Sequence, residues 1–349
     1  MKKLLKMFVF AMMLPVSLAF AADLPKTELA VVGGFSNLNA TMSVEKPLWT
    51  KTIPRNSGGK ITVKFTTLDQ MGLKGAETMR MVRNGVVDFV SGNLVHIAVD
   101  NQAFEALDVA GLLPSLGMAR EAVDKYFDTI DKHMAKTYNG KLLMVWPMPP
   151  QVIYCKEKLS SISGLKGRKV RVGSRTSADF VKGLGGVPVS VPWPDVIPAY
   201  QRGTIDCGIT GSLSGNTANW WEVTNYLLPL NLGWALWYHA VSLKKWNSLD
   251  PAVQNFLEAE LSKAQELFWE NAQLEIEDGI NCNTGIGPCK FGKKGAMKLV
   301  PVSKGDEALL KKLVKTVTLP SWAKACGAAC VKEFNNTVSG IVKIKAIAP

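Results

Sequence analysis

The sequence predicts an α/β protein of two domains, in which mainly parallel sheets are covered by helices. Segments with strand alternation and segments with helical spacing follow one another along both halves of the chain, which is typical of this architecture. The 349 residues make the chain about two domains long, at ~150 residues per domain. Hydrophobic residues make up 47% of the chain, which is enough to fill buried cores.

The first half alternates strand and helix. The predicted strands cover residues 28–34, 60–65 and 86–90, and the predicted helices cover residues 40–53 and 74–84. Pro54 and Gly85 end the two helices, because proline and glycine are the residues least favourable to a helix interior.

The same pattern then recurs, beginning with a strand at residues 142–146 that is followed by a proline-rich segment at 147–150, predicted to cross into the second domain. Predicted strands cover residues 142–146, 169–172 and 188–191, predicted helices cover 177–184 and 195–202, and a turn at 203–207 leads into another strand. No low-complexity linker separates the halves, so we expect short crossings with little freedom between the domains.

A long helix is predicted at residues 251–276, which have helical composition and no glycine or proline after Pro251. A helix of ~26 residues is ~39 Å long, more than one small domain, so we expect it to lie across both domains. The remaining chain contains a predicted strand at 297–301 and predicted helices at 306–316 and 320–331.

The N-terminus has the features of a secretory signal peptide, predicted at residues 1–21. Three lysines precede an apolar stretch at residues 4–18 or lie at its start, and Ala19-Phe20-Ala21 supplies the pattern that a signal peptidase cleaves after Ala21. A membrane anchor is disfavoured, because the apolar stretch is shorter than the ~20 residues that a bilayer requires. We therefore expect a periplasmic protein whose mature chain does not insert into the membrane.

The cysteines fit an oxidising compartment. Two pairs flank short loops: Cys282 with Cys289, and Cys326 with Cys330. Both are predicted to be short-range disulfides, and a metal site is disfavoured because no histidine lies near either pair. Cys155 and Cys207 lie in apolar, strand-like segments and are predicted to be buried thiols.

The net charge is basic but dispersed. The formal charge of +12, less the three lysines of the signal segment, leaves +9 on the mature chain. Because the basic residues are mixed with acidic ones and the chain is predicted to be exported, we expect no nucleic acid partner. A general attraction for anionic solutes is the more useful interpretation.

Motifs for catalysis are lacking. The three histidines, His96, His133 and His239, do not stand in a metal-ligand spacing. Residues 211–215 (GSLSG) resemble a nucleophile elbow but place Leu213 where the serine is required. We predict no catalytic site, no metal and no cofactor, and keep an exported enzyme acting on an organic acid as the alternative.

Residues suited to binding an anion are better represented. Arg171 lies near the end of the predicted strand 169–172, and ligands of open α/β sheets bind at the carboxyl ends of strands. A guanidinium there matches a carboxylate in two hydrogen bonds, and the helix starting near Ser177 would add free amides. A surface ion pair is the alternative for Arg171.

Tryptophans gather near the strand ends of the second half. Five lie within one stretch: Trp193, Trp220, Trp221, Trp234 and Trp237. Most such residues belong to the core, but one or two are expected to face a pocket. An aromatic or bulky apolar acid is a reasonable ligand on that ground.

Several segments together form a family motif. They are residues 165–172 (LKGRKVRV), 184–189 (LGGVPV), 193–196 (WPDV) and 200–206 (YQRGTID), with 58–63, 70–72 and 82–88 in the first half. The combination resembles the solute receptors of tripartite ATP-independent periplasmic (TRAP) transporters, of the dicarboxylate-receptor type. The resemblance covers nearly the whole mature chain.

The resemblance implies a two-lobed periplasmic binding protein fold, with hinge strands and a long helix crossing both lobes. We expect lobe I at residues 22–150 plus about 239–275, and lobe II at 151–238 plus about 276–349. The implied function is to bind a small organic acid and deliver it, unaltered, to the membrane permease subunits of a TRAP transporter. A ligand-sensing module for a signalling receptor is a further alternative.

The resemblance also implies a binding site centred on Arg171, which matches the arginine that clamps the substrate carboxylate. Gln151 stands where a second basic residue is often found, and Thr210 where an asparagine often contacts the ligand. Losing the second cation favours a monocarboxylate. The remaining predicted contacts are Trp193, Trp237, Phe35, Asn37, Asn39 and Gln70.

Overall fold

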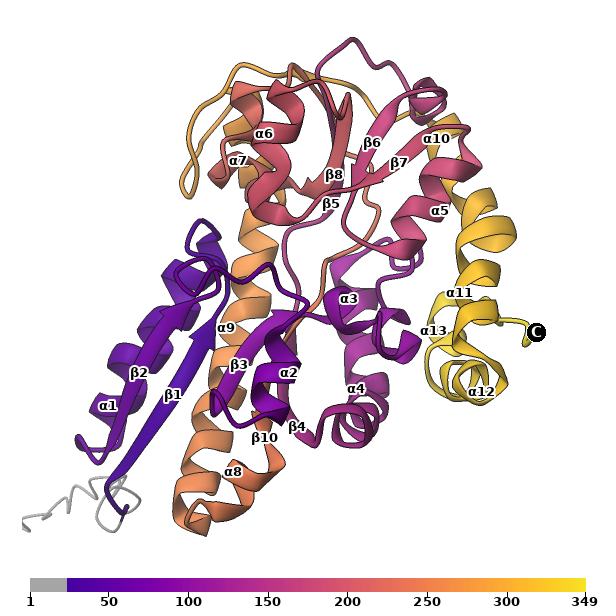
Figure 1. The fold of residues 1–349 in the computed structure, drawn as a ribbon. Helices are drawn as coiled ribbons and strands as arrows, with labels where there is room; N and C mark the ends of the chain where they lie inside the picture. The colour runs from indigo at the N-terminus through magenta and orange to yellow at the C-terminus, as the bar shows by residue number, and fades with distance from the viewer. Residues whose placement is uncertain (1–23) are drawn as a thin grey trace, which may run out of the picture.

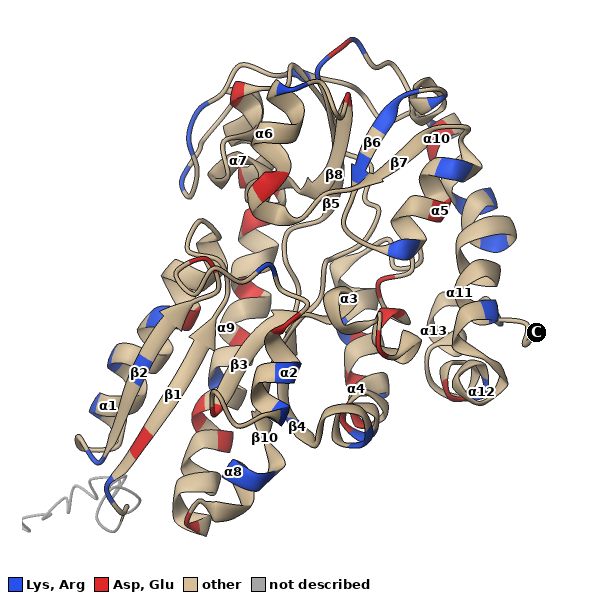
Figure 2. Ribbon diagram, viewed as in Figure 1, with Lys and Arg blue, Asp and Glu red and all other residues tan. Residues whose placement is uncertain are grey.

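The computed structural model describes residues 24–349, so the predicted signal peptide lies outside the described residues. Two sheets form the centres of two lobes, and helices cover their faces (Figure 1). This confirms the predicted two-lobed α/β fold. Figure 2 shows that basic and acidic residues are mixed along the ribbons of both lobes.

The first sheet has the strand order β2-β1-β3-β10-β4. Its strands are β1 (Thr27–Gly33), β2 (Ile61–Thr67), β3 (Phe89–Asn93), β4 (Gly140–Trp146) and β10 (Trp237–Ser242). β1 pairs in parallel with β2 and β3, whereas β10 is antiparallel to both β3 and β4. The strand that returns from the other lobe is therefore the one that runs against its neighbours.

The second sheet repeats this plan with the order β11-β9-β5-β8-β6-β7. Its strands are β5 (Gln151–Cys155), β6 (Lys169–Val172), β7 (Val187–Ser190), β8 (Cys207–Gly211), β9 (Tyr226–Leu228) and β11 (Lys298–Leu299). Here β5, the strand that enters from the first lobe, is antiparallel to β8 and β9. A compact apolar cluster that includes Tyr154, Tyr200 and Trp220 fills the space beneath this sheet.

Helices follow the strands in both lobes. They are α1 (Ile53–Asn56), α2 (Thr78–Arg83), α3 (Leu94–Ile97), α4 (Leu116–Tyr138), α5 (Arg175–Gly183), α6 (Val196–Gln201), α7 (Ser212–Thr217) and α8 (Leu243–Ser248), and near the C-terminus α10 (Lys304–Leu313), α11 (Leu319–Cys326), α12 (Ala328–Thr337) and α13 (Ser339–Val342). The C-terminal helices contact both lobes, because α11 packs on α5 and α12 packs on α4. The residue boundaries expected for the two lobes therefore stay a prediction. No helix among residues 24–349 is long and apolar enough to cross a membrane.

In the first lobe, the predicted boundaries of the two helices at 40–53 and 74–84 were wrong. The first helix does not stop before Pro54 but continues through it to Asn56, after π-helical turns at Thr41–Glu45 and Leu48–Thr52. Proline lies in the first turn of α1, and the wide π-helical turn before it reduces the clash that proline normally causes. The helix predicted at 74–84 begins at Thr78, because Gly75 has a φ of +111°, which no helix accommodates.

The long helix α9 (Pro251–Thr284) joins the two lobes and extends beyond its predicted end. At 1.5 Å per residue its 34 residues span about 51 Å. In the first lobe the Trp269 indole donates to the Val145 carbonyl of β4 at 3.2 Å. In the second lobe the Asn283 amide donates to the Ser212 carbonyl of α7 at 2.8 Å, and the backbones approach so closely that a Cβ at Gly279 would overlap α7.

Two further crossings, residues 147–150 and 229–236, run side by side between the lobes where hinge strands were predicted, and they connect β4 to β5 and β9 to β10 without strand structure of their own. The amide of Met148 donates to the Trp234 carbonyl at 2.8 Å, and Leu232 donates to the Gln151 carbonyl at 2.9 Å. The second crossing is held by Asp108, whose buried carboxylate accepts the amides of Trp234 and Leu236 at 3.2 and 2.6 Å. Between them Ala235 has a φ of +43°, a strained conformation that these two bonds maintain.

The disulfides include the two predicted pairs and one that was not predicted. Cys282 pairs with Cys289, and Cys326 pairs with Cys330. The prediction of buried thiols at Cys155 and Cys207 was wrong, because these two form a disulfide. They stand directly opposite each other on β5 and β8, with Cα atoms 4.1 Å apart, although 52 residues separate them in sequence.

We expect Asp108→Ala to lower the free energy of unfolding by about 2–4 kcal/mol, because it leaves two buried backbone N–H groups without acceptors. Urea unfolding followed by tryptophan fluorescence measures the change. Asp128→Ala, at an exposed site on α4, is the control and should stay within about 0.5 kcal/mol of the parent protein. Equal stability of the two variants would show that Asp108 does not hold the crossing.

Candidate functional site

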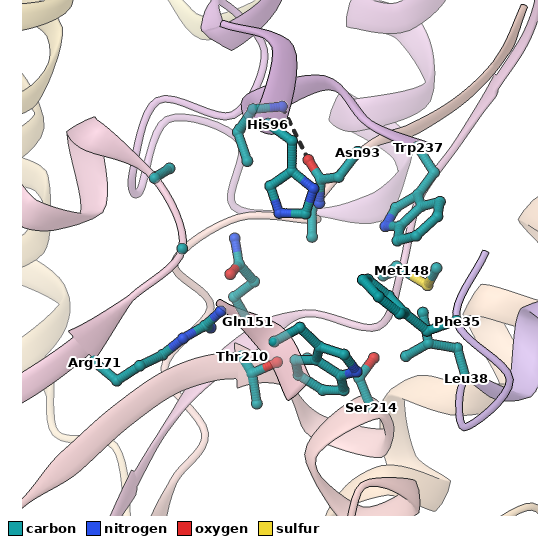
Figure 3. Close-up of a pocket in the computed structure, with 16 residues that line it drawn as sticks. Phe35, Leu38, Asn93, His96, Met148, Gln151, Arg171, Thr210, Ser214 and Trp237 are labelled. Carbon is teal, nitrogen blue, oxygen red and sulfur yellow. Dashed lines mark hydrogen bonds between the residues drawn. The ribbon is translucent and has the colours of Figure 1, made fainter. Parts of the chain in front are cut away.

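A cavity lies between the two lobes, where the edges of the two sheets face each other. It contains about 560 Å³ of unfilled space, a volume that includes its opening to solvent. Its lining comes from both lobes and both crossings: Phe35, Leu38, Asn93, Val95, His96, Met148, Gln151, Arg171, Gly173, Ser174, Trp193, Thr210, Gly211, Ser214, Ala235 and Trp237. Figure 3 shows many of these side chains pointing into the same space.

The sheet topology explains why these residues meet. β3, β6 and β8 run toward the cavity, so it is lined by residues at or just beyond their carboxyl ends, among them Asn93, Gly173 and Thr210. β5 and β10 run in the opposite direction, so they contribute their first residues, Gln151 and Trp237. Trp237 pairs with Asn93, and Gln151 pairs with Gly211.

Arg171 is buried at the wall of this cavity, with only 5% of its surface exposed. Its Nε donates to the Val191 carbonyl at 3.0 Å and its Nη1 donates to the Ile209 carbonyl at 2.9 Å. The guanidinium also lies over the Trp220 ring, 5.6 Å from the ring centroid. These contacts fix its orientation without neutralising its charge.

The electrostatics of the cavity are set by that one group. No carboxylate among residues 24–349 lies within salt-bridge distance of Arg171, and no other side chain lining the cavity is an aspartate, glutamate, lysine or arginine. Burial lowers the pKa of Arg171 to about 10, so the group stays positively charged near neutral pH. The cavity therefore presents a single fixed cation.

One wall of the cavity is apolar. Phe35 and Trp237 meet edge to face, with ring centroids 6.3 Å apart, and Leu38 and Met148 lie beside them (Figure 3). Trp193 covers another part of the lining and packs against Trp220, with centroids 5.6 Å apart. Such a surface fits the carbon skeleton of a small solute.

Six of the nine predicted site residues line the cavity: Arg171, Gln151, Thr210, Trp193, Phe35 and Trp237. Three do not. Asn37 accepts a hydrogen bond from the Trp193 indole at 3.1 Å and so connects the lobes. Asn39 donates to Glu275 of α9 at 2.6 Å, and Gln70 is exposed and accepts the Thr67 amide at 3.1 Å.

The amides expected at the helix after Arg171 are largely engaged. The helix begins at Arg175, two residues earlier than predicted. The Thr176 amide donates to Glu105 at 2.9 Å, and the Ser177 amide donates to the Ser174 side chain at 3.2 Å. The prediction of free amides from Ser177 onward was therefore wrong at Ser177 itself, because Ser174 caps the helix.

Sequence reasoning missed polar residues of the first lobe and of α7. Asn93 is the last residue of β3, His96 follows it on α3, and Ser214 lies on α7 just after β8. The signal that could have found them is the one used for Arg171, a polar residue at the carboxyl end of a strand. Among the described residues, no cluster of histidine, cysteine or acidic residues could hold a metal ion.

Two lobes, paired crossings and a cavity at the sheet edges define a two-lobed solute-binding protein. The chain belongs to the bacterial extracellular solute-binding protein family 7, whose profile matches residues 38–281, more than half of the chain. This confirms the family that the sequence motifs indicated.

Solved structures with the same fold cover nearly the whole chain. A Bordetella pertussis extracytoplasmic solute receptor that binds pyroglutamic acid superimposes with a TM-score of 0.80 at 18% identity, over 91% of this chain and 99% of the receptor. A TRAP solute-binding protein of Desulfovibrio salexigens with bound orotic acid gives 0.77 at 16% identity, over 90% and 98%. One of Sulfurospirillum deleyianum with bound succinate gives 0.73 at 17%, over 91% and 98%.

We expect His96 to stay neutral across the physiological range, because burial and the nearby Arg171 guanidinium lower its pKa to about 4. Its ring resonances in NMR spectra should not move between about pH 8 and about pH 5.5, whereas a histidine of ordinary pKa titrates there. His96→Gln assigns the signals by removing one set. A midpoint near pH 6.5 for His96 would contradict this environment.

Proposed function

We propose that the protein is the extracytoplasmic receptor of a TRAP transporter and binds a small organic monocarboxylate between its lobes. Arg171 pairs with the carboxylate, Gln151 and Thr210 assist, and the aromatic wall holds the carbon skeleton. The observation that carries the proposal is the buried Arg171 guanidinium, which faces the cavity and has no carboxylate partner among the described residues.

A buried charge without a counter-charge is unfavourable, and a ligand carboxylate would supply that counter-charge. A guanidinium has five N–H donors, and two of its nitrogens here each donate to a backbone carbonyl. The remaining N–H groups can form the paired bonds that match a carboxylate. The carbonyl contacts hold the group ready, so little ordering is required when the solute arrives.

The ligand class follows from the number of charges. A monocarboxylate is fully matched by one arginine, whereas a second carboxylate would lose its hydration without meeting a second cation. The neutral side chains of Gln151 and Thr210 form no hydrogen bond with other described residues, so both are free for a ligand. The similar receptors with known ligands bind organic acids, which supports an acid as the solute.

Delivery to a TRAP permease, without chemical change to the solute, is the role that solute receptors of this kind serve. The signal peptide predicted at residues 1–21 would bring the chain to the periplasm, where such a permease is reached. An exported enzyme is the alternative, and mass spectrometry separates the two. A receptor returns its solute with unaltered mass after prolonged incubation, and an enzyme does not.

We expect Arg171→Ala to weaken solute binding by about 2–5 kcal/mol, the range found when one partner of a buried charge pair is removed. Isothermal titration calorimetry measures the loss. Arg168→Ala is the matched control, since Arg168 lies three residues earlier and donates to the carbonyls of Glu157 and Lys158 outside the cavity. Full affinity in the Arg171 variant would refute the proposed binding mode.

Closure of the lobes has its own contacts at the rim of the cavity. Lys74 of the first lobe pairs with Asp195 of the second at 2.8 Å, near the bond between Asn37 and Trp193. Both charged side chains are about half exposed, so their attraction is modest and sensitive to salt.

We expect Lys74→Ala to speed solute release roughly two- to fivefold at low ionic strength and to have no effect at high salt. Stopped-flow measurement of tryptophan fluorescence follows the release, since Trp193 and Trp237 line the cavity. Lys60→Ala removes an exposed lysine of the same lobe and serves as the control. Equal release rates for both variants at low salt would show that the pair does not hold the lobes closed.

A further inference from the structure

We infer, building on the proposed function, that His96 and Asn93 select a monocarboxylate that carries an uncharged hydrogen-bond acceptor, such as a carbonyl, at the end remote from its carboxylate. The two residues stand on the first lobe, at the carboxyl end of β3 and on α3, whereas Arg171 stands on β6 of the second lobe. Figure 3 shows the His96 ring and the Arg171 guanidinium entering the cavity from different sides. A solute held by Arg171 would therefore present its other end to His96.

The surroundings of His96 decide which ring edge faces the solute. Its Nδ1 is buried and has no hydrogen-bond partner among the described residues. It lies against the backbone of Gly75, where any side chain beyond glycine would collide with it. With Nδ1 enclosed on that side, the opposite edge of the ring, which carries Nε2, faces the cavity.

The same contact decides where the proton is. A neutral imidazole carries one proton, on either Nδ1 or Nε2. A proton on Nδ1 would be a buried donor directed at the Gly75 backbone with no acceptor, which is the rarer and less favourable form of an unpaired group. The proton therefore sits on Nε2, and His96 offers a hydrogen-bond donor to the cavity.

Asn93 presents a second donor of the same kind. Its Oδ1 accepts the Val95 amide at 3.0 Å as the cap of α3, which fixes the direction of the side-chain amide. The Nδ2 group makes no hydrogen bond to another described residue, and Asn93 lines the cavity. The first lobe thus offers two neutral donors, and the complementary group on a ligand is an acceptor.

Charge and desolvation then narrow the chemical class of the ligand. A saturated hydrocarbon end would leave both donors unpaired in a closed cavity, which is unfavourable. A second carboxylate would find donors but no cation, and its charge would remain uncompensated. An uncharged carbonyl satisfies the donors without adding charge. The predicted solutes are therefore keto acids, lactam acids and related monocarboxylates.

Binding of shape-matched acids tests this inference. Levulinate, pentanoate and glutarate form a linear series, and an oxo-substituted cyclopentanecarboxylate with its unsubstituted parent forms a cyclic pair. By calorimetry, the oxo acid of at least one series should bind roughly tenfold or more tightly than its matched acids, corresponding to one or two hydrogen bonds. Failure of both oxo acids to bind better than their matched acids overturns the inference.

Variants assign the preference to His96. His96→Leu should abolish the tenfold preference for the oxo acid, and His96→Gln, which keeps an N–H donor, should retain part of it. His133→Gln is the control, because His133 lies away from the cavity and bonds to Glu333. An unchanged preference in His96→Leu would overturn the role of His96.

Two readouts separate this inference from the proposed function. Long-range proton–nitrogen NMR spectra report the tautomer, and a proton on Nδ1 of His96 would contradict the donor role whatever the affinities. If Arg171→Ala loses all acid binding but the parent protein shows no preference among acids, the proposed function stands and only the selectivity inference is overturned. If Arg171→Ala binds acids at full affinity, the proposed binding mode, in which Arg171 pairs with the carboxylate, is itself overturned.

Discussion

The architecture of this protein depends on the Arg171 guanidinium, which is buried and charged at the boundary between the two lobes. The second sheet supplies two carbonyl acceptors for Arg171, and Trp220 covers its face, so the group is rigid even though its charge is uncompensated. Neither lobe alone encloses the cavity, because its lining is drawn from strands of both sheets. The fold therefore leaves the positive charge of Arg171 without a counter-charge, and a negatively charged ligand in the cavity would supply one.

The antiparallel strands are what bring the chemistry of the two lobes together. In each sheet the strand that crosses from the other lobe runs against its neighbours, so its first residue lies beside their last ones. Gln151 and Trp237 thereby join side chains that end parallel strands. A purely parallel pair of sheets would have placed these residues at the far edges. Connectivity, rather than a local motif, assembles the site.

The sequence predicted the α/β class, the long helix, and the position of Arg171, because alternation, helical spacing and a strand-end arginine are local signals. It did not predict the pairing of Cys155 with Cys207, which depends on the register of β5 against β8. Asn39 and Gln70 come after β1 and β2, and Asn93 is the last residue of β3, yet Asn39 bonds to α9 and Gln70 bonds to the end of β2. A position at the end of a strand indicates a candidate ligand contact, and the packing of the loops determines which of these residues face the cavity.

The unbroken helix α9 also limits how the lobes can part. It is hydrogen-bonded to β4 at one place and to α7 at another, so it behaves as a strut that keeps the two bodies at a constant separation along its axis. Bending about a line near the paired crossings separates the lobes while it keeps both of these contacts, whereas sliding of one lobe along the helix breaks one of them. Because the lobes have few ways to move relative to each other, the protein loses little conformational entropy when it closes on a ligand.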